Sequence, residues 1–155
     1  MQNVSVKGKA LNNMTHIIND VNALRAQGAI DTASRLNVPV CLMHMQGKPQ
    51  NMQENPQYQN IVEDVVSFLK ERVQACIHAG IEKHNIILDP GFGFGKTFEH
   101  NIELLSQLDA ISALNFPVLV GLSRKSLLDK LTGRNVDERL AGSISLAIIA
   151  LQNSA

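Results

Sequence analysis

The sequence predicts a parallel α/β fold, and two patterns in the chain indicate it. Short apolar segments alternate four times with segments that have the apolar spacing of helices. The short segments are also apolar throughout, as strands are when helices cover both faces of a parallel sheet. We therefore expect four parallel strands joined by helices. Periodicity alone does not decide between an open parallel sheet and part of a closed barrel.

The first half of the chain supplies two of these strands. Thr15 to Asn19 (THIIN) is expected to form a short buried strand, and Ala29 to Leu36 a small helix. The second strand is expected over Pro39 to His44 (PVCLMH). The polar segment from Gly47 to Pro56 has a proline near each end and is expected to be a mobile loop.

A long amphipathic helix and the third strand are expected next. The helix is indicated by apolar residues at helical spacing, namely Ile61, Val65, Phe68, Leu69, Val73, Cys76 and Ile77. Acidic residues favour its first turn, and Gly80 supplies its end. The third strand is expected over Ile86 to Asp89, followed by a helix from Ile102 to Leu108.

The last part of the chain supplies the fourth strand and two helices. Pro117 to Gly121 (PVLVG) has the apolar character of a strand, and a helix is expected from about Lys125 to Leu131. A final helix is expected to begin near Asp137, a good N-cap residue, and to continue to the end of the sequence.

Composition narrows the function classes. The chain has 155 residues, the size of one ordinary domain, and 45% of them are hydrophobic. Basic and acidic residues number 14 each, which argues against a general nucleic-acid binder or an electrostatic membrane binder. Cys41 and Cys76 lie in apolar surroundings and are expected to be reduced core residues of a cytoplasmic protein. No apolar run has the length of a membrane span, and the first residues lack the apolar core of a signal peptide.

Polar residues follow each of the four predicted strands. Asn19 and Asp20 follow the first, His44 ends the second, Asp89 ends the third, and Ser123 to Ser126 (SRKS) follow the fourth. The carboxyl ends of parallel strands meet at one edge, where such folds bind their ligands. The sequence therefore predicts a polar ligand site above an apolar sheet.

The segment LDPGFGFGKT, residues 88 to 97, is the most informative part of this edge. Asp89 follows an apolar strand directly, and a buried carboxylate lowers stability unless a partner binds it. The glycines at Gly91, Gly93 and Gly95 allow backbone amides to approach a ligand closely. A purely structural interpretation is that Asp89 caps the loop and the glycines only turn it.

The residue types at this edge suit a heterocycle. Asp89 can accept two parallel hydrogen bonds from a guanidine-like edge such as that of a 2-amino-4-oxopteridine, each contributing about 1.5–3 kcal/mol. Lys125 can donate to the oxo group, and Asn19 offers both a donor and an acceptor. Ser126 and the amides that begin the next helix can bind an anion.

A nucleotide-binding alternative rests on Pro90 to Thr97, which nearly match the pattern of a phosphate-binding loop. Proline occupies the first glycine position, and the next helix is expected near Asn101, whereas a phosphate-binding loop leads directly into its helix. The histidines have no metal-ligand spacing, and His44 is expected to be a hydrogen-bonding residue at a strand end.

Five motifs in this sequence are together specific to one protein family. HIINDV (residues 16–21), PVCLMHMQGKPQNMQ (39–53), LDPGFGFGKT (88–97), VGLSRKS (120–126) and ERLAGS (138–143) occur in order. Together they closely resemble bacterial dihydropteroate synthase over residues 15–155. The resemblance implies a TIM (β/α)8 barrel, of which this chain would be the central four β/α units. It also implies the joining of p-aminobenzoate to 6-hydroxymethyl-7,8-dihydropterin pyrophosphate in folate biosynthesis, a transferase reaction that gives 7,8-dihydropteroate and pyrophosphate. The resemblance implies further that sulfonamides compete with p-aminobenzoate.

The resemblance also assigns roles to residues. It implies that Asn19, Asp89 and Lys125 line the pterin pocket, that Met43 packs in it and that Gly93 approaches the ring. It implies further that Phe94 borders p-aminobenzoate and that Ser126 meets its carboxylate. The implied mechanism is displacement of pyrophosphate, bound to Mg²⁺, with no nucleophilic side chain and no certain catalytic residue among these positions.

The chain also departs from the family's pattern. The first three strands and the final strand, with the residues for magnesium and pyrophosphate, have no counterpart, and residues 1–14 form an atypical segment before a partial domain at 15–155. These 155 residues are therefore expected to show little or no synthase activity. They are expected to form a homodimer through two open sheet edges, at Thr15 to Asn19 and Pro117 to Gly121. A non-catalytic pterin-binding module is the alternative function.

Overall fold

The structure, a computed structural model, describes residues 16–153 and 155. The atypical segment 1–14 and Thr15 lie outside these residues. The elements in chain order are β1 (Ile18–Asp20), α1 (Ala29–Leu36), β2 (Val40–Met43), α2 (Ile61–His78), a 3₁₀ turn η1 (Lys83–Asn85), β3 (Ile86–Asp89), α3 (Phe98–Ser106), α4 (Asp109–Ser112), α5 (Ser126–Thr132), a second 3₁₀ turn η2 (Val136–Glu138) and α6 (Leu140–Gln152).

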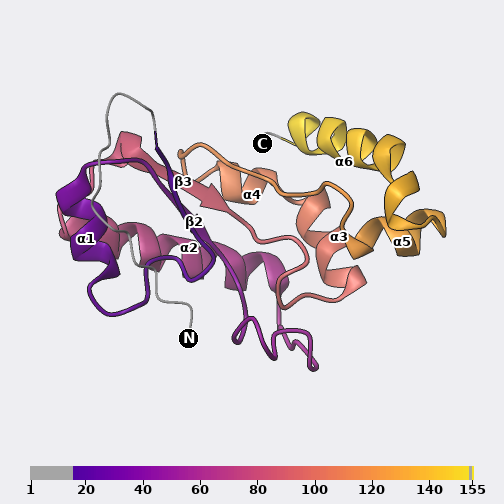
Figure 1. The fold of residues 1–155 in the computed structure, drawn as a ribbon, viewed down its shortest axis with the longest axis horizontal. Coiled ribbons are helices and arrows are strands. Elements are labelled where there is room, and N and C mark those ends of the chain that lie inside the picture. The colour runs from indigo at the N-terminus through magenta and orange to yellow at the C-terminus, as the bar shows by residue number, and fades with distance from the viewer. Residues whose placement is uncertain (1–15, 154) are drawn as a thin grey trace.

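The three strands form one parallel sheet in the order β1-β2-β3, which confirms the predicted α/β fold (Figure 1). Neighbouring strands in space are successive strands in the chain. That order is typical of a β/α barrel, whereas doubly wound open sheets reverse their order at a switch point. In the pairing of β2 with β3, Met43 lies opposite Asp89. The carboxyl ends of both strands therefore lie at the same level.

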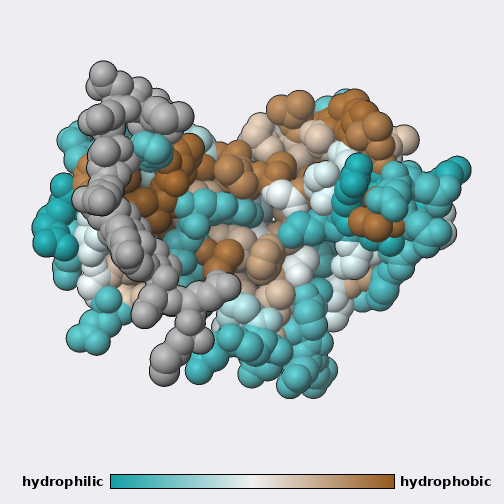
Figure 2. Space-filling view, in the orientation of Figure 1, coloured by the Kyte–Doolittle hydropathy of each residue, from teal (hydrophilic) through white to brown (hydrophobic). Residues whose placement is uncertain are grey.

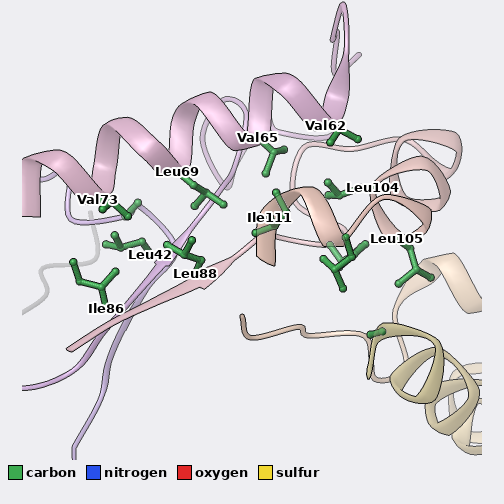
Figure 3. Packing of buried hydrophobic residues seen from close by; sticks show 14 of the residues in the cluster. Leu42, Val62, Val65, Leu69, Val73, Ile86, Leu88, Leu104, Leu105 and Ile111 are labelled. Atoms are coloured by element: carbon green, nitrogen blue, oxygen red, sulfur yellow. The ribbon is translucent and has the colours of Figure 1, made fainter. Parts of the chain in front are cut away.

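Helix α2 covers one face of this sheet and contributes six residues to the buried core. The Asn60 side chain starts the helix, because its Oδ1 accepts the N–H groups of Val62 and Glu63 at 3.0 and 3.1 Å. On one stripe of α2, Leu69 and Val73 face Leu42, Ile86 and Leu88 of the sheet, whereas Val62 and Val65 lie toward Leu104 and Ile111 (Figure 3). Burying each such side chain contributes about 1.5–3 kcal/mol. This packing fixes the two strands whose ends carry the candidate site.

Two predicted strands differ from the observed ones. β1 begins at Ile18 and is half-buried to exposed, not buried, because it is the edge strand of the described sheet. Pro117 to Gly121 form no strand: Val118 makes a single bridge to Leu88, with Leu88 N–H donating to Pro117 O at 2.9 Å and Leu119 N–H to Leu88 O at 2.8 Å. Within the described residues, the pairing of this segment consists of that one bridge, which is too short to form a strand.

The helices also begin differently from the prediction in two places. α3 begins at Phe98, four residues before Ile102, because Thr97 Oγ1 accepts His100 N–H and His100 Nδ1 accepts Thr97 N–H, both at 3.2 Å. Histidine replaces the usual Glu or Gln of a capping box, so the sequence pattern hides this start. Asp137 does not cap the last helix; Asn135 starts the 3₁₀ turn η2, and α6 follows at Leu140. None of the described helices is long and apolar enough to cross a membrane.

Candidate functional site

The carboxylate of Asp89 lies at the end of β3 with only 6% of the residue exposed. Gly91 N–H donates to its Oδ1 at 2.7 Å, and this is the carboxylate's one hydrogen bond within the described part of the chain. Asp89 therefore does cap the loop, as the purely structural interpretation expects, but this one bond uses little of the carboxylate's capacity to accept. Burial raises the pKa of Asp89, while the Gly91 amide, Lys96 and Lys125 act in the opposite direction. A ligand bearing N–H donors would stabilise this ionised group.

The glycine loop lies directly against the residues that follow β2. Gly91 has φ +72°, and a Cβ there would lie 1.9 Å from the carbonyl oxygen of His44. At Gly95 a Cβ would lie 2.7 Å from the carbonyl oxygen of Gln46. Both distances are shorter than van der Waals contact allows, so only glycine permits this approach. The glycines here are required by packing against the neighbouring strand end.

Three side chains from outside the loop hold its backbone in place. Gln53 Nε2 donates to Gly93 O at 2.6 Å, and Tyr58 Oη donates to Gly95 O at 2.6 Å. Asn101 Oδ1, on α3, accepts Gly93 N–H at 2.8 Å. None of the three was a predicted site residue, since each looks like an ordinary polar residue in the sequence.

Lys96 ends the loop and points into it. Its Nζ contacts His44 Nδ1 at 2.9 Å, Gly91 O at 2.9 Å and Phe94 O at 3.1 Å. The helix-position argument against a phosphate-binding loop is wrong, because α3 begins at Phe98, directly after Thr97. The use of Lys96 Nζ by the loop's own carbonyl groups, however, leaves that amine unavailable for a phosphate.

Lys125 approaches the same loop from the other side. Its Nζ lies 4.4 Å from the centre of the Phe94 ring, a cation–π distance, and its Cδ would lie 3.4 Å from a Cβ at Gly93. Partial burial lowers the pKa of Lys125, and Asp89 counteracts that shift. The structure thus brings together five of the predicted site residues: Met43, Asp89, Gly93, Phe94 and Lys125.

Ser126 and Asn19 lie farther out. Ser126 lines an adjacent cavity of about 270 Å³ between the loop, α3 and α5, together with Gln53, Pro56, Lys96, Thr97, Phe98, Asn101, Leu127 and Lys130. Asn19 is exposed on β1 beside Cys41, and within residues 16–153 no hydrogen bond joins its side chain to the other site residues. A ligand would therefore have to bridge from the loop to reach Asn19.

Two residues of the ERLAGS motif support Lys125. Arg139 Nη1 donates to the carbonyl oxygens of Arg124 and Lys125 at 3.3 and 3.4 Å. Ser143 Oγ accepts Arg124 N–H at 3.0 Å. Arg124 has φ +53°, so its backbone depends on such support. The motif contributed to the resemblance, but its residue types alone indicate no such role.

The described chain has no evident metal centre. Among residues 16–153 and 155, no three His, Cys, Asp or Glu side chains come together in a way that could hold a metal ion. Magnesium is commonly held by one or two carboxylates together with substrate phosphates and waters, so the magnesium that the resemblance implies stays an expectation.

Lys96 should make stability depend on pH. Burial lowers its pKa from 10.5 to about 7, while Asp89 counteracts the shift. Between these pH values the unfolded chain binds more protons at this amine than the folded chain, so the free energy of unfolding should rise with pH across the window. Urea denaturation at several pH values should show a steeper rise for the wild type than for Lys96→Met. Equal slopes would contradict the expectation.

Known proteins are similar to this sequence. A family model described as "Pterin binding enzyme" matches residues 2–155. Dihydropteroate synthase of Haemophilus influenzae is 47% identical over 150 residues, covering 97% of this chain and 54% of that protein. The chain thus spans about half the length of the curated relatives it matches.

Solved structures of dihydropteroate synthases are similar to this chain in fold and in sequence. Yersinia pestis dihydropteroate synthase, in a sulfonamide complex, matches with TM-score 0.86 and 43% identity over 89% of this chain and 50% of that chain. The Xanthomonas albilineans enzyme with 4-aminobenzoic acid matches with TM-score 0.83 and 46% identity over 90% of this chain and 49% of that chain. The resemblance and the partial barrel fold are confirmed.

Proposed function

Since the chain belongs to the pterin binding enzyme family, we propose that it acts as a dihydropteroate synthase of folate biosynthesis. It would join p-aminobenzoate to 6-hydroxymethyl-7,8-dihydropterin pyrophosphate. The observation that carries the proposal is the buried carboxylate of Asp89 at the end of a parallel strand. This carboxylate can accept further hydrogen bonds, and the charge of Lys125 acts on it. A site of this kind matches the guanidine-like edge of a pterin.

Each site residue has a role in this proposal. Asp89 accepts two N–H groups of the pterin ring, and Lys125 donates to the oxo group. Met43, buried beside Asp89 at the end of β2, packs against the ring. Phe94 borders p-aminobenzoate, and Ser126 at the start of α5 meets its carboxylate. Asn19 contacts the pterin edge from β1.

The reaction is a displacement at the pterin methylene carbon. The amine nitrogen of p-aminobenzoate forms a bond to that carbon, the carbon–oxygen bond to pyrophosphate breaks, and the amine loses a proton. Charged groups fixed around the ring stabilise the cationic transition state, so no side-chain nucleophile is needed. Magnesium, when bound, would neutralise charge on the pyrophosphate.

Two measurements test the function. Calorimetry with 6-hydroxymethylpterin should show binding. In a product assay with p-aminobenzoate, these 155 residues are expected to form little or no dihydropteroate, and a sulfonamide should inhibit any formation. Clear turnover would exclude the non-catalytic module. Absence of pterin binding in a folded sample would overturn the proposal.

We further propose that the protein forms a homodimer and lies in the cytoplasm. Leu140, Ile144 and Ile148 lie one helical turn apart on α6 and are exposed, and hydrophobic residues gather over that helix in Figure 2. Exposed apolar patches of this kind support self-association. The free, buried thiols of Cys41 and Cys76 fit a reducing compartment. Sedimentation showing a stable monomer at micromolar concentration would contradict the dimer.

A further inference from the structure

Three acceptors converge on the amine of Lys96, which is 4% exposed. The acceptors are His44 Nδ1 and the carbonyl oxygens of Gly91 and Phe94, at 2.9, 2.9 and 3.1 Å. A lysine ammonium has three N–H donors and no acceptor, so these three contacts use all of them. His44 O, at 3.4 Å, is a fourth and weaker neighbour. The group is therefore fully hydrogen-bonded although it is buried.

This arrangement fixes the protonation of His44. When Lys96 is charged, His44 Nδ1 must accept, so the ring is neutral and carries its proton on Nε2. The ring is buried against Phe68, with ring centres 5.0 Å apart, and near Tyr58. Burial and the charges of Lys96 and Arg25 lower the pKa of His44 to about 3, so the ring stays neutral at physiological pH.

We propose that Lys96 is a positioning residue of the pterin site, acting through His44 and the loop carbonyl groups. Its three hydrogen bonds join the end of β2 to both Gly91, which binds the Asp89 carboxylate, and Phe94. They therefore fix Asp89 and the Phe94 ring relative to each other. The charged groups that face Lys96 are Asp89 and Lys125. The pterin ligand in this inference rests on the proposed function. The contact between Lys96 and His44 does not depend on that function.

Nitrogen NMR of His44 tests the contact without any ligand. Long-range proton–nitrogen spectra distinguish the Nε2–H tautomer from the Nδ1–H tautomer. In the wild type at pH 6 we expect the Nε2–H form, whereas Lys96→Met should lose this preference, because no donor then faces Nδ1. A wild-type ring protonated on Nδ1 at pH 6, or an unchanged spectrum in Lys96→Met, would overturn the proposal.

Pterin affinity tests the positioning role. We expect Lys96→Met to raise the Kd for 6-hydroxymethylpterin about fivefold, the equivalent of one hydrogen bond. Lys70→Met, at an exposed position on α2, is the matched control and should bind like the wild type. Unchanged affinity in a folded Lys96→Met protein would overturn the role.

The outcomes separate this inference from the proposed function. If the wild type binds no pterin, the proposed function fails. The His44 spectra and the hydrogen exchange of the backbone amides from Gly91 to Phe94 then still decide whether Lys96 holds the loop in place. If Lys96→Met does not fold, the wild-type tautomer decides the contact. Faster exchange in Lys96→Met than in Lys70→Met supports the role, and equal exchange overturns it.

Discussion

Replacing Asp89 by asparagine is expected to weaken pterin binding at least tenfold, which corresponds to about 1.4 kcal/mol. The asparagine side chain would retain an oxygen to accept Gly91 N–H, the bond that holds the loop at 2.7 Å in the wild type. The other carboxylate oxygen would become an NH₂ donor facing the donors of the ligand. The variant therefore removes ligand recognition while it preserves the loop.

The Asp89→Asn replacement should affect the stability of the fold differently from pterin affinity. Burial raises the pKa of Asp89, so the ionised carboxylate is disfavoured in the folded state and its replacement removes a buried charge. The melting temperature of Asp89→Asn should consequently not fall. Glu71→Gln makes the same chemical change at an exposed position of α2 and should leave both quantities unchanged. Calorimetry showing wild-type affinity in Asp89→Asn would remove Asp89 from the site.

The polar residues at the carboxyl ends of the strands, which form the candidate site, were predictable because they are recognised from the local sequence. An apolar strand that runs directly into a carboxylate defined β3 at Ile86–Asp89 with the expected bounds. The small helix predicted at Ala29–Leu36 also has the expected bounds. Parallel packing then places the strand ends together, whichever strand neighbours which. Asp89 and Lys125 could therefore be chosen from the residues alone, and they do act on each other's charge in the fold.

The supports of the site were not predictable, because each depends on contacts distant in sequence. Lys96 bonds to His44, 52 positions earlier, and Gln53 bonds to Gly93, 40 positions later. Lysine and glutamine are normally solvated, so nothing local indicates these partners. The predicted strand at Pro117 to Gly121 failed for a related reason. Its apolar composition suits a strand, but a ladder needs partners that propensity cannot supply.

Replacing Gly91 by alanine is expected to lower the free energy of unfolding by about 2–5 kcal/mol, the sum of an unfavourable backbone conformation and a steric overlap. The residue has φ +72°, a conformation that costs an L-residue stability. The new Cβ would lie 1.9 Å from His44 O, a backbone atom that cannot move without displacing the end of β2. Urea denaturation measures the loss, and pterin affinity should fall with it.

Gly28→Ala separates the two causes. Gly28 has φ +73°, nearly the same φ as Gly91, yet a Cβ there would meet no atom within 4 Å. Its replacement should cost only the backbone penalty of about 1–2 kcal/mol. The difference between the variants then measures the close approach of the loop to His44, on which the shape of the candidate site depends. Equal losses in the two variants would show that the loop moves away from β2 at little cost, and that the contact does not shape the site.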